Sequence, residues 1–150
     1  MDGLDSGVYA LLLELRRSAT VRAGSLGELR LPAGRYVYVG SARRGLAARL
    51  TRHCRREKRL RWHIDYLRPA AEVVGAVVWP WRQGRECRLA RALLSEGLGQ
   101  IAASRFGASD CRCPAHLLVV PSAELGILAR ELSAALGEQP TQLLTFGAEA

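Results

Sequence analysis

The sequence predicts a single α+β domain in which a small, mostly antiparallel sheet is flanked by helices. Two observations support this class. The 150 residues are 49% apolar and 24% charged, which suits one compact domain over residues 1–150 rather than two independent cores. Apolar or β-branched runs also alternate with segments of helical periodicity, in the order strands, helix, strand, helix, strand, helix.

The N-terminal part of the chain predicts a series of strands. Residues 7–15 (GVYALLLEL) form an apolar run between polar residues, as in a buried strand. Residues 20–22 and 29–31 predict shorter strands separated by a glycine-containing turn, and residues 36–39 predict another after a proline–glycine turn.

A first helix is predicted over residues 44–57. Leu46, Leu50 and Cys54 recur every four residues there, which indicates one buried face. A short element at residues 62–67 (WHIDYL) follows and ends before a proline.

The C-terminal half predicts two strands and two helices. Residues 72–79 form a β-branched strand, and residues 85–95 form a helix that begins after a glycine. A polar, cysteine-containing loop at 104–115 precedes a short apolar strand at 117–120. A last helix is expected over residues 122–136, capped by serine and ended by glycine.

The basic residues are concentrated in one segment. The chain has 22 Lys and Arg against 14 Asp and Glu, a formal charge of +8, and residues 41–61 alone hold nine basic residues and one acidic residue. Such a segment on an otherwise neutral body predicts a polyanionic partner, most simply nucleic acid. A solvated arginine-rich helix is the alternative. The residues expected to contact nucleic acid are Arg43, Arg44, Arg52, Arg55, Arg56, Arg59 and His63.

No apolar run in the sequence reaches the roughly 18 residues that a membrane-spanning helix requires. The N-terminal residues 1–5 are acidic where a signal peptide would be basic, so we expect a cytoplasmic protein without a membrane partner. The sequence indicates neither a protein partner nor a homodimer.

Two tripeptides, GVY at residues 7–9 and YVG at residues 38–40, place a tyrosine on each of two predicted strands. The helix that follows carries Arg49 and His53 four residues apart, so both side chains project from the same face. A helical wheel puts them beside the apolar stripe, and we expect them to lean toward the sheet edge where the tyrosines emerge.

These motifs resemble those of the GIY-YIG nuclease superfamily, with the helical pattern Arg49-x-x-x-His53 as the third element. A little-characterised branch of that superfamily is more similar still, through WHIDYL (62–67), ECRLA (86–90) and SDCRCPAHL (109–117). The resemblance implies a three-stranded antiparallel sheet flanked by helices. It also implies metal-assisted hydrolysis of one phosphodiester bond at a time.

The resemblance further implies a catalytic role for each matched residue. Tyr9 and Tyr38 would position the attacking water, with one of them helping to remove its proton. Arg49 would bind the scissile phosphate, and His53 would transfer a proton or contact phosphate. An acidic residue would hold Mg²⁺ or Mn²⁺, in keeping with the preference of such ions for oxygen ligands.

The motifs leave the identity of that acidic residue open. Glu86 begins the helix after the long predicted strand, and we choose it as the catalytic and Mg²⁺-binding residue. Glu72 is the alternative, whereas Glu57 is expected to be a salt-bridge partner inside the basic helix.

The four cysteines are expected to be reduced. Cys111, Cys113 and His116 are residue types that suit Zn²⁺, and Cys87 is a conceivable fourth ligand. Structural zinc sites, however, usually use cysteine pairs about two to four residues apart. We therefore expect buried thiols that order a loop together with Asp110 and His116, with zinc as the alternative.

Several polar and aromatic residues near these motifs have two interpretations. Tyr36 shares a strand face with Tyr38, so it either joins the site or packs beside it. His63 and Asp65 either belong to the site or form a buried polar pair that holds a turn. Trp79 is expected to end a strand packed on the core.

The leading hypothesis is a metal-dependent endonuclease that acts on DNA, including branched or damaged DNA of the kind met in DNA repair. One alternative is a nucleic-acid-binding module of the same fold that does not cleave; it predicts salt-sensitive binding without a metal-dependent product. The other is a scaffold domain that binds a protein through the Cys/His loop and has no appreciable affinity for nucleic acid.

Overall fold

The computed structural model describes residues 5–56, 58–108, 111–121 and 124–146. The strands are β1 (Gly7–Leu15), β2 (Ala19–Arg22), β3 (Glu28–Leu31), β4 (Gly34–Ala42), β5 (Glu72–Trp79), β6 (Gln100–Ile101), β7 (Leu117–Val119) and β8 (Gln142–Thr145). The helices are α1 (Leu46–Cys54), α2 (His63–Leu67), α3 (Arg85–Ser95) and α4 (Leu125–Leu136), with short 3₁₀ helices η1 (Gly24–Leu26) and η2 (Arg68–Ala70).

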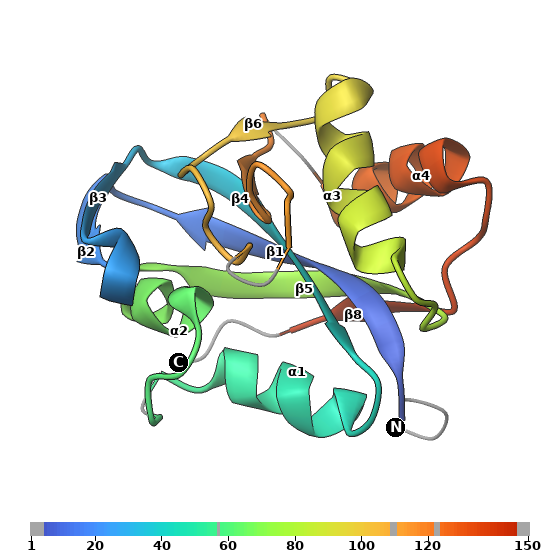
Figure 1. Ribbon diagram of the computed structural model, residues 1–150, viewed down its shortest axis with the longest axis horizontal. Helices are drawn as coiled ribbons and strands as arrows, with labels where there is room; N and C mark the ends of the chain where they lie inside the picture. The colour runs from blue at the N-terminus through green and yellow to red at the C-terminus, as the bar shows by residue number, and fades with distance from the viewer. Residues whose placement is uncertain (1–4, 57, 109–110, 122–123, 147–150) are drawn as a thin grey trace.

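The main sheet has six strands in the order β6-β7-β4-β1-β5-β8, and every neighbouring pair is antiparallel (Figure 1). β2 and β3 form a separate two-stranded sheet. The α+β class with an antiparallel sheet is therefore confirmed, although the sheet is wider than the three strands expected. None of the helices in the described part of the chain is long and apolar enough to cross a membrane.

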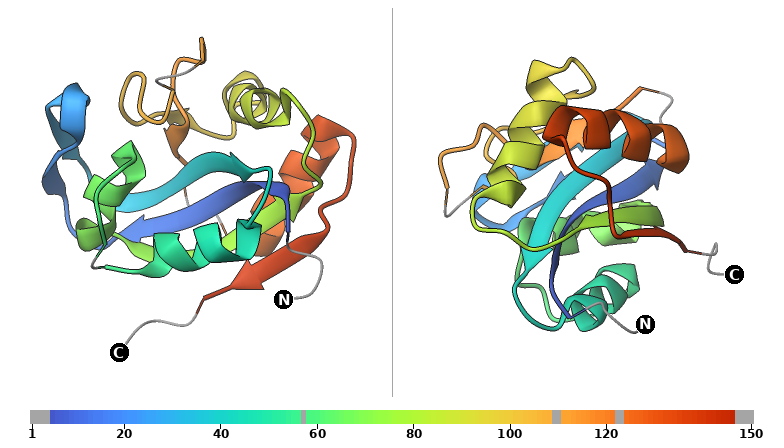
Figure 2. Two further views of the ribbon diagram at one scale, coloured as in Figure 1. Left: turned by 60° about the horizontal axis from the view of Figure 1, so that its bottom comes forward. Right: turned by 90° about the vertical axis from the view of Figure 1, so that its right-hand side faces the viewer.

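Helices cover both faces of the main sheet, with α1 on one side and α3 and α4 on the other (Figure 2). Alternation along β1 explains this, because successive side chains of a strand point to opposite faces. Leu11 and Leu13 pack in the cluster that includes residues of α1 and α2, whereas Val8 and Leu12 pack in the cluster that includes residues of α3 and α4.

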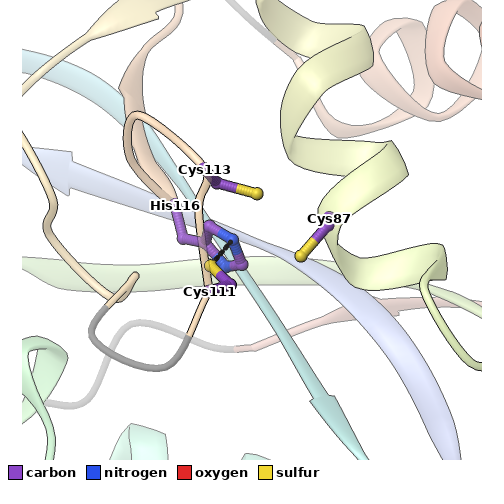
Figure 3. A group of neighbouring side chains, drawn as sticks. All are labelled: Cys87, Cys111, Cys113 and His116. Carbon is purple, nitrogen blue, oxygen red and sulfur yellow. Dashed lines mark hydrogen bonds between the residues drawn. The ribbon is translucent and has the colours of Figure 1, made fainter.

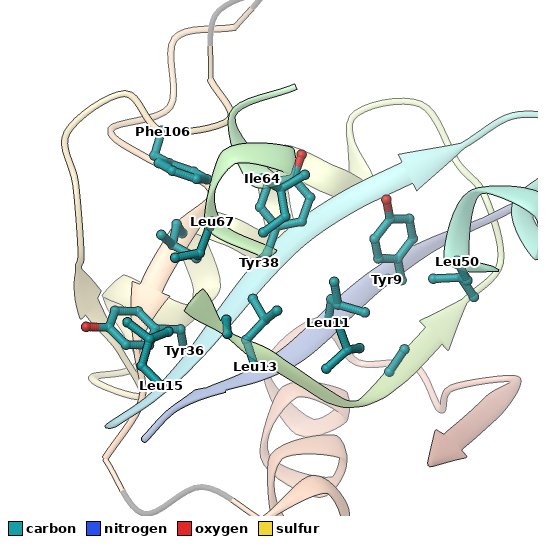
Figure 4. Close-up of a cluster of buried hydrophobic side chains, with 14 of the residues drawn as sticks. Tyr9, Leu11, Leu13, Leu15, Tyr36, Tyr38, Leu50, Ile64, Leu67 and Phe106 are labelled. Carbon is teal, nitrogen blue, oxygen red and sulfur yellow. The ribbon is translucent and has the colours of Figure 1, made fainter. Parts of the chain in front are cut away.

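The pairing of β1 with β4 puts the two motif tyrosines on one face of the sheet. Tyr9 lies opposite Gly40, and Leu11 lies opposite Tyr38. Figure 4 shows the rings of Tyr9 and Tyr38 on the same side of this strand pair. Gly40 is required here, because a Cβ atom at this position would lie 2.5 Å from the Tyr9 hydroxyl oxygen.

The basic segment differs from the single helix predicted over residues 44–57. α1 begins at Leu46 and ends at Cys54, and Arg55 already has extended backbone angles. Further on, the carboxylate of Asp65 accepts hydrogen bonds from the backbone N–H groups of Arg61 and Trp62, which fixes the approach to α2. The salt bridge expected for Glu57 concerns a residue outside the described ranges.

Two strands were not predicted from the sequence. β6 has only two residues, both exposed, and β8 is an edge strand whose residues are exposed or half-buried. Neither has the continuous apolar run that made β1 and β5 recognisable, so the hydrophobic pattern carries little signal for them.

Candidate active site

The candidate site lies along the edge of β4, just beyond the end of β7. β7 pairs with β4 as far as Leu117 opposite Tyr38, and the carbonyl of His116 then accepts one more hydrogen bond from the N–H of Val39. Among the described residues, no strand pairs with this edge of β4 from Gly40 onward. Side chains from both faces of the sheet can therefore meet there.

Arg49 of α1 and Glu86 of α3 meet at this edge and bind the same residue. The Arg49 guanidinium donates a hydrogen bond to the Ser41 carbonyl, and the Ser41 hydroxyl donates one to the Glu86 carboxylate. Ser41 thus connects a cation from one face of the sheet to an anion from the other.

A pocket of about 190 Å³ opens at this position. The five residues predicted to be catalytic all line it: Tyr9, Tyr38, Arg49, His53 and Glu86. The structure thus brings together side chains from two strands and two helices that are far apart in the sequence.

Tyr9 and His53 form a buried pair in the floor of this pocket. The Tyr9 hydroxyl lies 2.6 Å from His53 Nε2, and the two residues are 1% and 2% exposed. Burial, followed by the charge of Lys58, lowers the pKa of His53 to about 3, so its ring is neutral at pH 7. Burial and the neighbouring Tyr38 raise the pKa of Tyr9 well above its usual value, so Tyr9 remains protonated.

Aromatic rings hold the other walls of the pocket. Tyr38 meets the rings of His53 and Phe106 edge-on, at centroid distances of 5.8 and 6.4 Å. The guanidinium of Arg49 lies 4.8 Å from the centre of the Trp62 ring, where a cation is attracted to the aromatic face. Arg49 is therefore positioned from two directions, by this ring and by a backbone carbonyl.

Glu86 is held as a carboxylate by two hydrogen-bond donors. One is the Ser41 hydroxyl, and the other is His116 Nδ1, 2.8 Å from Glu86 Oε2. Burial alone would raise the pKa of Glu86, but the hydrogen bonds from His116 and Ser41 outweigh it and lower the pKa. The alternative carboxylate, Glu72, lies outside this pocket and pairs with Arg16 at 3.2 Å.

Arg52, also expected to contact nucleic acid, is half-buried and pairs with a buried carboxylate. Its guanidinium makes two 2.8 Å hydrogen bonds to the carboxylate of Asp65, whose side chain is fully buried. Burial alone would raise the pKa of Asp65, but these bonds and those from the backbone lower it. Asp65 therefore holds a turn, but not as a pair with His63: its ion-pair partners are Arg52 and, at 3.7 Å, Lys58.

The other arginines expected to contact nucleic acid lie on the surface. Those that are exposed are Arg43, Arg44, Arg55, Arg56 and Arg59. Arg43 lies 4.8 Å from the Trp81 ring, and Arg56 donates a 3.3 Å hydrogen bond to the Pro69 carbonyl.

His63 differs from these arginines because it lines the pocket itself. Its Nδ1 accepts a 2.8 Å hydrogen bond from the Gly107 N–H, and its ring packs against Phe106 at 5.4 Å. Its contacts thus fix the loop that forms one wall of the pocket.

Two further aromatic residues have structural roles. Tyr36 does not line the pocket, and its hydroxyl donates a 2.6 Å hydrogen bond to the Pro32 carbonyl. Trp79 is fully buried, and its indole N–H donates a 3.0 Å hydrogen bond to the Glu138 carbonyl. Trp79 thus packs on the core at the end of a strand, as predicted.

A second group of polar side chains lies beside the pocket. Cys87 of α3 faces Cys111, Cys113 and His116 (Figure 3). These three residues belong to the loop before β7, and His116 is the last residue of that loop. Their potential ligand atoms all lie within 4.8 Å of one another, so this cluster could hold a metal ion. Burial and the neighbouring Cys113 and Cys111 raise the pKa of the Cys87 thiol to about 12. Asp110, expected to help order the loop, lies outside the described residues.

Sequence reasoning missed the residues that support the site. Ser41 and His116 each hydrogen-bond Glu86, and Trp62 stacks with arginines. His116 belongs to the SDCRCPAHL motif and Ser41 directly follows the YVG tripeptide, but the sequence carries no signal that pairs either of them with Glu86.

The fold and the site together define an α+β domain with a tyrosine-, arginine- and glutamate-lined pocket next to a cysteine–histidine cluster. Residues 8–138 match the family described as Domain of unknown function DUF123, and the chain belongs to this family. No curated protein and no solved structure matches the chain. The resemblance to GIY-YIG nucleases stays a prediction, so function has to be argued from the site.

Proposed function

We propose that this domain is a metal-dependent endonuclease of the GIY-YIG type that hydrolyses phosphodiester bonds in DNA. The observation that carries the proposal is the meeting of Arg49 and Glu86 with Tyr9 and Tyr38 in one pocket at the open edge of β4. The pocket offers a cation for phosphate, a carboxylate for a metal ion and hydroxyl groups for water.

Arg49 is the group that would bind the scissile phosphate. A water that loses its proton becomes an anionic nucleophile, which an anionic phosphodiester repels. Fixed cationic donors lower the barrier by stabilising charge that grows on the phosphate oxygens. The contacts of Arg49 with Trp62 and the Ser41 carbonyl hold its guanidinium at the pocket before substrate arrives, which reduces the reorganisation needed for catalysis.

Glu86 is the residue that would hold Mg²⁺ or Mn²⁺. Its carboxylate lines the pocket, is ionised, and keeps lone pairs beyond those used by Ser41 and His116, so it fits an ion that binds oxygen and retains several waters. A bound divalent ion would supply Lewis-acid stabilisation of the leaving oxygen.

Tyr9 and His53 would move the proton of the attacking water. Tyr9 is protonated in the free protein, so it acts as a base only by passing its own proton to His53 Nε2, 2.6 Å away. The negative charge of a bound phosphate would raise the pKa of His53, because an opposite charge nearby favours the protonated ring. Tyr38, across from His53, would orient the water.

The exposed arginines next to the site would guide the nucleic acid. Arg43 and Arg44 lie on the segment that joins β4 to α1, and together with Arg49 they line a neighbouring surface hollow. Phosphate contacts of this kind are independent of base sequence and weaken as the salt concentration rises.

Zn²⁺ is the ion proposed for the cysteine–histidine cluster. Three thiols and one imidazole are soft or borderline ligands in a number that suits tetrahedral zinc, whereas Mg²⁺ prefers oxygen. The one-residue spacing of Cys111 and Cys113 weighed against zinc in the sequence, but the fold supplies Cys87 from another element as the fourth ligand.

The test offers the purified protein single-stranded, nicked, flapped and branched DNA, and matched RNA, with Mg²⁺, Mn²⁺ or chelator. We expect metal-dependent cleavage of at least one DNA substrate. Arg49→Ala should lower the rate by about 10²–10³-fold, and Tyr9→Phe by about 10²-fold. Glu86→Gln should abolish the cleavage that depends on Mg²⁺.

The matched control is Arg130→Ala, which removes an exposed arginine of α4 outside the pocket and should leave cleavage unchanged. Absence of cleavage on every substrate would refute the nuclease. Salt-sensitive binding without cleavage would then identify the non-catalytic binding module.

A further inference from the structure

His116 belongs to both groups of side chains described above. Its Nε2 lies 3.5 Å from Cys111 Sγ, and its Nδ1 lies 2.8 Å from Glu86 Oε2. We propose that zinc bound at the cysteine–histidine cluster positions the Glu86 carboxylate through the His116 ring. The inference rests on the proposed function, because it assigns a positioning system to the carboxylate of that same site.

The hydrogen bonds of His116 determine which ring nitrogen is available to a metal. Nδ1 faces two acceptors, the Glu86 carboxylate at 2.8 Å and the Val39 carbonyl at 3.2 Å. A nitrogen between two acceptors has to carry a hydrogen atom, so in the neutral ring Nε2 keeps the lone pair. Nε2 is the nitrogen that lies beside the thiols.

The distances in the cluster suit a tetrahedral ion. With bond lengths typical of zinc, ligand atoms of a tetrahedral site lie about 3.5–3.8 Å apart. The 3.5 Å separation between Cys111 Sγ and His116 Nε2 lies in this range. All four potential ligand atoms lie within 4.8 Å of one another, so small side-chain movements would bring the other pairs to tetrahedral distances.

An arginine holds the backbone that carries two of the cysteines. The guanidinium of Arg105 donates hydrogen bonds of 2.7 Å to the carbonyls of both Cys111 and Cys113. Arg105 itself has a left-handed backbone, with φ of 65°, which is uncommon for a residue other than glycine. The backbones of Cys111 and Cys113 are thus tied to the same side chain, which limits how far the two cysteines can move apart.

Zinc at the cluster would join α3 to this loop directly next to the pocket. Cys87 follows Glu86 in the first turn of α3, so a bond from Cys87 to zinc fixes the position of the helix end. The bond from zinc to His116 Nε2 fixes the ring, whose Nδ1–H then holds Glu86 Oε2. Hydrogen bonds of this kind between metal-bound histidine and carboxylate orient both partners.

The test measures metal binding directly and does not depend on cleavage. Zinc content is measured by mass spectrometry, and Mn²⁺ affinity is measured by electron paramagnetic resonance titration. The wild-type chain should contain one zinc and bind Mn²⁺, and Glu86→Gln should keep the zinc and lose the Mn²⁺ site. His116→Cys keeps a four-ligand zinc site but lacks the imidazole donor, so it should retain zinc while its Mn²⁺ affinity falls about 10–100-fold.

Cys87→His is the matched control, because it also exchanges one zinc ligand type for another but leaves His116 and Glu86 in place. It should keep both the zinc and the Mn²⁺ affinity. A chain purified without zinc overturns the proposal, and so does a zinc-loaded His116→Cys protein with wild-type Mn²⁺ affinity. Mn²⁺ binding that is insensitive to Glu86→Gln refutes the proposed catalytic metal site as well, so the two failures are distinguishable.

Discussion

Glu86 and Cys87 are consecutive residues of α3, yet they face two groups with opposite chemistry. Glu86 presents oxygen ligands to the pocket and to Ser41, whereas Cys87 presents sulfur to two other thiols and an imidazole. Successive residues of an α-helix point about 100° apart, so one turn can serve both sites. The difference shows that adjacent residues of one helix can belong to two chemically distinct groups of side chains.

The same contrast occurs on α1, between Arg49 and Arg52. Arg49 lines the pocket and stacks on Trp62, whereas the guanidinium of Arg52 forms an ion pair with the buried carboxylate of Asp65. Substitution of a pocket residue such as Arg49 should lower the cleavage rate with little effect on stability. Substitution of a supporting residue such as Arg52 should lower stability with little direct effect on cleavage. Four predictions test this division, from the largest expected effect to the smallest.

Cys113→Ser should remove a fully buried thiol from the cluster and with it the zinc proposed there. Because binding energy at a structural metal site contributes to folding, we expect a loss of about 4 kcal/mol or more in the free energy of unfolding. Urea denaturation checks this. Cys54→Ser, at a cysteine outside the cluster, is the control and should cost less than about 1.5 kcal/mol. Equal effects of the two substitutions would contradict a metal site.

Arg52→Ala should destabilise the fold by about 3 kcal/mol, because it removes both 2.8 Å bonds to the buried carboxylate of Asp65 and leaves Lys58, at 3.7 Å, as the remaining cation beside it. Arg49→Ala, one turn away, should change stability by less than about 1 kcal/mol while it lowers cleavage strongly. The free energy of unfolding and the cleavage rate are measured for both variants. If both substitutions lower the free energy of unfolding equally, or both lower the cleavage rate equally, Arg49 and Arg52 do not have the separate roles assigned to them.

Acid should destabilise the protein through His53. Its pKa is about 3 when folded and about 6.5 when unfolded, so between these values the unfolded chain binds the extra proton. The stability associated with this residue is complete above pH 6.5 and is lost as pH falls, by about 1.4 kcal/mol per pH unit. His53→Gln should remove that part of the slope between pH 6 and about 4.5. If the free energy of unfolding falls equally steeply with pH in the wild type and in His53→Gln, the pKa of His53 is not lowered by folding.

Gly40→Ala should have the smallest of the four effects on stability. The added Cβ would lie 2.5 Å from the Tyr9 hydroxyl, so the end of the ring has to move, at a cost of about 1 kcal/mol. Gly126→Ala is the control on α4, where a Cβ meets nothing within 4 Å, and it should be neutral or slightly stabilising. Unfolding of both variants is followed by urea titration. A Gly40→Ala protein as stable as wild type would mean that Tyr9 is not packed against β4.

Much of the fold could be predicted from the local pattern of apolar, glycine and proline residues. The strands β1 and β5 and the helix α3 have the bounds predicted for them, because continuous apolar runs and flanking glycine or proline residues mark their ends. α1 was predicted too long, since charged residues after Cys54 are compatible with a helix in isolation. There the contacts of Asp65 with the backbone before α2 determine the path of the chain.

The candidate site divides in a similar way. The spacing of Arg49 and His53 predicted a shared helix face, and both residues line the pocket. The choice between Glu86 and Glu72 could not be made by spacing, because it depends on which element ends beside β4. Only the packing of α3 at the open edge of that strand brings Glu86 to Ser41.

The sequence by itself determined the class of fold, the bounds of β1, β5 and α3, and the side chains that share one face of a helix or strand. These follow from short-range periodicity and turn chemistry, which act over a few residues. The tertiary structure alone decided the partners of Arg52, the joining of Cys87 to the loop before β7, and the two roles of His116. Those pairings join elements far apart along the chain, so they depend on how the helices pack on the sheet and on where β7 ends.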